Sequence, residues 1–258
     1  MLGGMVETGT IEPTQFDART RLYIWLTGAF VTCLLVADIT GSKFFHFDVF
    51  TVGLPVVGDY NFVTHSAGML SFPITFLLTD LINEYYGRRG ARRITYIGVA
   101  CAAMAFTLIF TARKLPVAVG SPIPQDTFDA VFAMSNRLYI ASLTAFLVGQ
   151  LMDIWLFGVL KRLSKGRMVW LRATGSTLVS QAMDSFLVSA ILLYGTVRVP
   201  AAGDTPAQVW SVGQILEVAF TGYLLKIVLS VCLTPVIYLG RWLIRTRLGL
   251  SPVAAEKA

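Results

Sequence analysis

The sequence predicts an all-α membrane protein with six transmembrane helices and cytoplasmic N- and C-termini. Its composition supports this fold class, because the 258-residue chain is 55% hydrophobic and only 14% charged, whereas soluble domains carry about 25% charged residues. The mean hydropathy is +0.67. The chain also contains about six apolar runs near the roughly 20 residues that a helix needs to cross a bilayer. Its basic residues cluster at alternate ends of these runs.

The expected helices divide the chain into a central region and two tails. Residues 1–18 and 248–258 are predicted to be cytoplasmic tails, and residues 19–247 are predicted to form a six-helix transmembrane transport domain. The helices are expected at residues 22–40, 65–86, 94–112, 138–160, 173–197 and 212–247. The intervening segments are broken by glycine and proline and are predicted to be loops. Pro235 should kink the last helix or split it.

Lysine and arginine set the orientation of these helices. If the N-terminus is cytoplasmic, 15 of the 21 basic residues fall in cytoplasmic segments. Cytoplasmic loops of membrane proteins carry such an excess. The clusters consist of Arg19, Arg21, Arg88, Arg89, Arg92, Arg93, Lys161, Arg162, Lys165, Arg167, Arg172, Arg241, Arg245, Arg247 and Lys257. The net charge of +6 is therefore assigned to the membrane topology, and no nucleic-acid partner is expected.

Small residues recur along the first expected helix. Ala29, Cys33 and Ala37 follow one another every four residues, and such a stripe lets another helix approach closely. Most stripes of this kind serve packing within the chain, and a minority dock a partner. The stripe leaves open a homodimer or a coupling-module partner.

The second expected helix has a polar face. Asp80, Asn83 and Glu84 are three and four residues apart, so they share one side of the helix. Gly87 and a cluster of arginines follow, and they indicate the cytoplasmic end. This combination is typical of a helix that lines a polar site inside the bilayer.

Further ionisable residues lie within the apolar runs. They are Asp153, Asp184, Glu217 and Lys226, with Asp38 at the outer end of the first helix. An ionisable residue near the bilayer centre costs about 2.5–3.5 kcal/mol on insertion scales. Counting Asp80, four deep carboxylates face one deep lysine. The excess must be protonated, hydrated or satisfied by a ligand that donates hydrogen bonds.

Glutamines lie three residues before three of these acids, so each pair shares a helical face. We expect the polar faces to meet in the bundle interior, with a central site around Asp184 and an inner layer around Asp80 and Asp153. Phe72 could stack on a planar ligand, a contact worth roughly 1–3 kcal/mol. The predicted substrate-binding residues are Asp184, Glu217, Gln181, Gln214, Lys226, Gln150, Asp153, Asp80 and Phe72.

Carboxylates and amides held on rigid helices suit a flat heterocycle. A carboxylate can accept two parallel hydrogen bonds from an amidine-like edge, such as that of guanine. On chemistry alone, the ligand is a small polar solute that donates hydrogen bonds. We expect no catalytic residue, metal site or cofactor. The three cysteines lack metal-ligand spacing, His46 and His65 lie near the predicted outer surface, and the common hydrolase motifs are absent from the sequence.

The order of these residues also resembles a known family. The matching pieces are Ser71-Phe72-Pro73, Thr79-Asp80-Leu81, Gly87, Gly149-Gln150, Asp153, Trp170-Leu171, Thr174, Ser176-Thr177-Leu178, Asp184, Glu217, Tyr223, Lys226 and Pro235. On these pieces the chain resembles the queuosine precursor transporter family of bacterial inner-membrane proteins, formerly grouped as vitamin uptake transporters, and the resemblance extends over roughly residues 20–245.

The resemblance implies uptake of 7-cyano-7-deazaguanine or 7-aminomethyl-7-deazaguanine, which are precursors of the modified tRNA base queuosine. It also implies a multi-pass protein of the bacterial inner membrane. An alternative stays open, because the six-helix layout is also similar to the substrate-binding subunits of energy-coupling-factor transporters, which take up vitamin-like or purine-like solutes. In that case the Ala29, Cys33 and Ala37 stripe would dock the coupling module.

Overall fold

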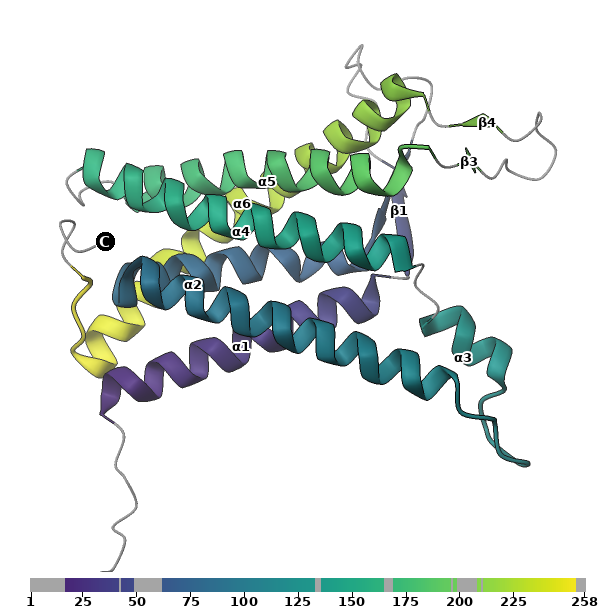
Figure 1. Cartoon of the computed structure of the whole chain (residues 1–258). Helices are drawn as coiled ribbons and strands as arrows, with labels where there is room; N and C mark the ends of the chain where they lie inside the picture. The colour runs from purple at the N-terminus through teal and green to yellow at the C-terminus, as the bar shows by residue number, and fades with distance from the viewer. Residues whose placement is uncertain are drawn as a thin grey trace, which may run out of the picture.

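The computed structural model describes residues 17–41, 43–48, 62–132, 136–164, 169–195, 197–198, 208–209 and 211–253. Several sequence predictions lie outside these residues. They are the tail segments 1–16 and 254–258, the centre of the loop at 41–63, the break at Pro200, Gly203 and Pro206, and the basic residues Lys165, Arg167 and Lys257. The described part is a bundle of long helices, with short strands at one end (Figure 1).

The described elements are mainly helical, as predicted. The helices are α1 (Ala18–Thr40), α2 (Phe72–Arg113), α3 (Gln125–Phe132), α4 (Asn136–Leu163), α5 (Val169–Leu193) and α6 (Val212–Leu248), and the 3-10 turn η1 (Ala67–Leu70) precedes α2. Among the described residues, five helical segments are long and apolar enough to cross a membrane, and they contain α1, α2, α4, α5 and α6.

Two short antiparallel ribbons lie between the helices, whose predicted all-α fold class is confirmed. Strand β1 (Phe44–Asp48) pairs with β2 (Phe62–Ser66), and β3 (Val197–Arg198) pairs with β4 (Gln208–Val209). The first ribbon lies in a segment expected to be a loop. Its strands are rich in phenylalanine, valine and threonine, which favour extended pairing. Helix α3 likewise lies within the predicted loop at 113–136.

Helix α2 contains the helix expected at 94–112 and most of the one expected at 65–86, and it bends sharply at Gly87. The start predicted at residue 65 was wrong, because the first residues of that range belong to β2 and η1. The backbone there has φ 70° and ψ −178°, a conformation that only glycine adopts readily. Residues 82 and 90 of a straight helix would be about 12 Å apart along the axis. A Cβ atom on Gly90 would instead lie 3.8 Å from the Cγ2 atom of Ile82. The chain therefore reverses direction within α2, and its two arms run antiparallel toward the same end of the bundle (Figure 1).

We expect Gly87→Ala to destabilise the protein by about 1–3 kcal/mol, because an alanine Cβ is strained in this backbone conformation. The measurement is the unfolding temperature of the purified protein in detergent. Gly28→Ala is the matched control, because Gly28 lies in the regular helix α1 with no atom within 4 Å of an added Cβ. Equal unfolding temperatures for the two variants would contradict the prediction.

At Pro235, one of the two predicted alternatives, a split helix, is excluded. The proline lies inside one continuous helix and does not split it. Neighbouring helices and hydroxyl side chains let membrane helices tolerate such a proline. The ends of α6 have clear signals, since Ser211 and Gln214 form a capping box at the start and Gly249 has a left-handed conformation at the end.

The long helices pack in the order α1, α2, α4, α5 and α6, and α6 closes back onto α2. One apolar core lies between α1, α2 and α4 around Phe30, Ile82 and Phe146. A second joins α2, α4, α5 and α6 around Tyr85 and Phe157. Many large apolar side chains face outward from every long helix. An apolar outer surface of this extent belongs in a lipid bilayer, so the chain is a multi-pass membrane protein.

The small-residue stripe of α1 is partly used inside the chain. Cys33 packs against the first core, and Ala37 is buried where its carbonyl meets the backbone of Gly68. Ala29 is exposed. Contact with a partner through this stripe stays a prediction.

Candidate functional site

A cavity of about 350 Å³ lies at the end of the bundle near β1. Residues from α1, η1, α2, α4, α5 and α6 line it, so every membrane-crossing helix contributes to its wall. Its volume lies within the range of small-molecule sites, about 300–1,000 Å³. We call it the outer cavity.

An ion pair crosses the outer cavity. The Lys226 ammonium on α6 contacts the Oδ2 atom of Asp184 on α5. The two side chains are 9% and 13% exposed, respectively, so the pair is largely shielded yet reaches the cavity. Phe72, at the start of α2, lines the same cavity and contacts the ring of Phe146. The structure therefore brings together three of the nine predicted residues.

The outer cavity also holds polar residues that the sequence-based site did not include. Asp38 at the end of α1 accepts a hydrogen bond of 3.5 Å from the Ser142 hydroxyl on α4. Ser185 and Ser189 lie one turn apart on α5, and the Ser185 hydroxyl has no hydrogen-bond partner among the described residues. The signal for the serines was available, because Gln181, Ser185 and Ser189 are four residues apart and therefore share one face of α5.

Two of the predicted residues, Gln214 and Glu217, lie on α6 outside the lining of the outer cavity. Gln214 is in the first turn of α6, where its side-chain oxygen accepts a hydrogen bond from the Ser211 amide at 3.0 Å. Neither Gln214 nor Glu217 is among the described residues that line the outer cavity, and both are partly exposed.

The remaining four predicted residues are buried deeper in the bundle. Asp80 on α2 and Asp153 on α4 are 2% and 0% exposed. The Asp153 carboxylate accepts hydrogen bonds from Thr177 at 3.3 Å and Ser180 at 3.1 Å, both on α5. It also has the Asp80 carboxyl as a side-chain partner. We call these groups the inner polar layer.

Gln150 and Gln181 are the most unusual of the buried polar residues. They are 0% and 1% exposed, and neither amide nitrogen nor amide oxygen has a hydrogen-bond partner among the described residues. An unpaired buried amide costs free energy. Such groups are suited to pairing with a ligand or with water.

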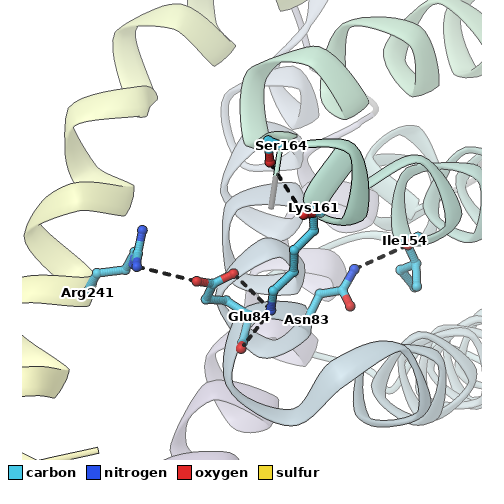
Figure 2. A network of polar contacts seen from close by, with 6 residues as sticks. All are labelled: Asn83, Glu84, Ile154, Lys161, Ser164 and Arg241. Carbon is cyan, nitrogen blue, oxygen red and sulfur yellow. Dashed lines mark hydrogen bonds and ion pairs between the residues drawn. The ribbon is translucent and has the colours of Figure 1, made fainter. Parts of the chain in front are cut away.

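A second charged network closes the opposite end of the bundle (Figure 2). The Glu84 carboxylate on α2 contacts Lys161 of α4 at 3.3 Å and Arg241 of α6 at 3.4 Å. The Lys161 ammonium also donates to the Glu84 carbonyl, and Asn83 donates to the Ile154 carbonyl at 3.2 Å. The side chains of Glu84 and Lys161 are 4% and 3% exposed, so their ion pair is shielded from solvent.

The first and last described segments of the chain also lie at this end. The Val253 amide donates to the Glu84 carbonyl at 3.0 Å, and Arg19 donates to the Ser251 carbonyl at 3.3 Å. Tyr86 donates to the Arg19 carbonyl at 2.6 Å. We call this the basic end, because it gathers segments that contain four of the predicted arginine and lysine clusters.

Comparisons with known proteins agree on one family. The family model described as "Putative vitamin uptake transporter" matches residues 66–240. A "Probable queuosine precursor transporter" of Bacillus subtilis is 28% identical over 183 residues, which are 70% of this chain and 74% of that protein. A protein of the same name from Haemophilus influenzae is 24% identical over 222 residues, 83% of this chain and 84% of that protein.

A third relative is the "Queuosine precursor transporter" of Escherichia coli, which is 28% identical over 170 residues, 64% of this chain and 66% of that protein. No solved structure matches this chain significantly.

Proposed function

Since the chain belongs to the vitamin uptake transporter family, it is a transporter and not an enzyme, and we propose that it takes up queuosine precursors across the bacterial inner membrane. The expected substrates are 7-cyano-7-deazaguanine and 7-aminomethyl-7-deazaguanine. The names of three relatives support this substrate class. The chemistry of the outer cavity supports it independently.

The proposed topology has six crossings with both termini in the cytoplasm. The bend at Gly87 supports two crossings by α2, which with α1, α4, α5 and α6 make six. The contacts of Arg19, Lys161 and Arg241 gather basic segments at one end, and the positive-inside rule assigns that end to the cytoplasm. The outer cavity then opens away from the cytoplasm, and the Glu84 network closes the cytoplasmic side.

The observation that carries the proposed substrate is the Asp184 carboxylate in a cavity of about 350 Å³. A deazaguanine presents a ring N–H and an exocyclic amine side by side, and one carboxylate can accept both hydrogen bonds. Lys226 could donate to the substrate carbonyl. Phe72 offers a ring for stacking. The cavity therefore supplies the groups that a planar, hydrogen-bonding heterocycle requires.

The other predicted residues have supporting roles in this proposal. Gln150 and Gln181 would pair with substrate as it moves inward from the cavity, because their amides are buried without partners among the described residues. Gln214 and Glu217 would act at the entrance, near the start of α6. Asp80 and Asp153 would lie on the inner side of the path.

Binding and uptake test the proposal separately. We expect 7-cyano-7-deazaguanine to raise the unfolding temperature of the purified protein, with a smaller effect of guanine. We also expect uptake into liposomes that contain this protein alone. An absence of any shift with either deazaguanine would contradict the substrate class. Binding without uptake, restored by an added ATPase module, would instead favour the coupling-factor subunit.

A further inference from the structure

A second cavity lies in the inner polar layer and shares no lining residue with the outer cavity. Its volume is about 20 Å³, enough for one water-sized particle and far too small for a heterocycle. Residues from α2, α5 and α6 line it. Five of them carry oxygen on short side chains: Asp80, Thr174, Thr177, Ser230 and Thr234.

One of these oxygens has no partner within the described chain. The Ser230 hydroxyl is 9% exposed and makes no hydrogen bond there. Thr234 has a different environment, because its hydroxyl lies 3.2 Å from that of Thr174 across the α5–α6 contact. A buried hydroxyl without a partner costs free energy. Ser230 is therefore the group that a small particle in this cavity would satisfy.

The charge around the cavity favours a cation. Asp80 lines it, and Asp153 contacts Asp80 and accepts hydrogen bonds from Thr177 and Ser180. Two buried carboxyl groups in contact require a proton or a cation between or beside them. A shared proton would relieve the two carboxyls but would leave Ser230 without a partner. A metal cation in the cavity would contact the Asp80 carboxyl and the Ser230 hydroxyl, which both belong to its lining.

The size of the second cavity and the oxygen groups of its lining favour a monovalent cation. Carboxylates and hydroxyls are hard oxygen ligands. Magnesium usually keeps several waters, and a space of about 20 Å³ does not hold them. The lining supplies one carboxylate, Asp80, which matches the charge of a monovalent ion better than that of calcium. Coupling-ion sites of secondary transporters lie near the substrate path in the bundle interior. We propose that the inner polar layer binds one dehydrated sodium ion, which couples to the transport function proposed above.

The experiment uses the full-length purified protein in detergent without any deazaguanine. Sodium chloride replaces choline chloride at constant ionic strength and pH, and the unfolding temperature is measured. We expect a saturable rise with sodium. Ser230→Ala and Thr177→Val each remove one oxygen, and we expect either to weaken the apparent sodium affinity about tenfold or more. Thr107→Val is the control, because its hydroxyl is on an exposed part of α2.

Several outcomes would overturn the proposal. One is an equal response to sodium and potassium, and another is a response to pH without a response to sodium. Unchanged sodium affinity in both Ser230→Ala and Thr177→Val would also overturn it, since these small substitutions should leave the fold intact. Because no substrate is present, failure here is distinct from failure of the deazaguanine assignment, which the binding experiment measures.

Discussion

Asp184→Asn is expected to weaken binding of 7-cyano-7-deazaguanine about 10- to 100-fold, because hydrogen bonds to a charged group are worth about 1.5–3 kcal/mol. The substitution keeps the shape of the side chain but removes an acceptor from the amidine-like edge. The affinity is measured by calorimetry or by thermal shift across a substrate titration. The same variant leaves the Lys226 ammonium without its ion-pair partner, so a loss of stability should accompany the loss of binding.

A double variant separates these two effects. Asp184→Asn combined with Lys226→Met removes the uncompensated charge, so stability should recover relative to the single variant. Binding should not recover, because the carboxylate is still absent. If the double variant binds substrate normally, the Asp184–Lys226 pair is architectural. Glu217→Gln then provides the matched comparison at the entrance, where the same change of charge should affect affinity less.

Glu84→Ala is expected to lower the free energy of unfolding by about 3–5 kcal/mol, because it leaves a buried lysine without its carboxylate. Lys161 is 3% exposed, and Arg241 loses the same partner. The change should be visible as a lower unfolding temperature and as faster proteolysis at the basic end. In liposomes, we also expect that the outer cavity of this variant is closed less tightly on its cytoplasmic side.

Asp129→Ala is a suitable control for this prediction. It breaks the Arg113–Asp129 contact of 2.8 Å, whose side chains are 26% and 36% exposed. Such solvent-accessible ion pairs contribute little to stability. A similar loss in both variants would mean that burial of Glu84 does not determine its contribution. If Glu84→Ala keeps full stability, the Glu84 network is not the main interaction that stabilises the basic end.

The membrane class was predictable from the sequence because it depends on composition and length. Apolar runs of about 20 residues and clustered arginines identify spans and their ends without knowledge of packing. The bend at Gly87 was marked by glycine followed by arginines. The β1–β2 ribbon was not predicted, because aromatic residues near a membrane surface are equally compatible with a loop.

The candidate site was predictable only in part, and distance along the chain explains why. Helical periodicity shows which residues share a face of one helix, as it does for Gln181 and Asp184 on α5. Periodicity does not show the register between two packed helices, that is, how far one is offset along the axis of the other. The Asp184–Lys226 contact depends on the register between α5 and α6. The register also decides that Asp38 reaches the outer cavity.

The bond between the Val253 amide and the Glu84 carbonyl has a consequence for biosynthesis. Its partners are separated by most of the chain, and Glu84 lies in a helix that is made early. Chains fold from the N-terminus as they emerge from the ribosome. The first helices are therefore in the membrane before Val253, which shares this carbonyl with Lys161 as a donor, has been translated. If the nascent chain is released before Val253 is made, the helices are inserted but lack the hydrogen bond between Val253 and Glu84.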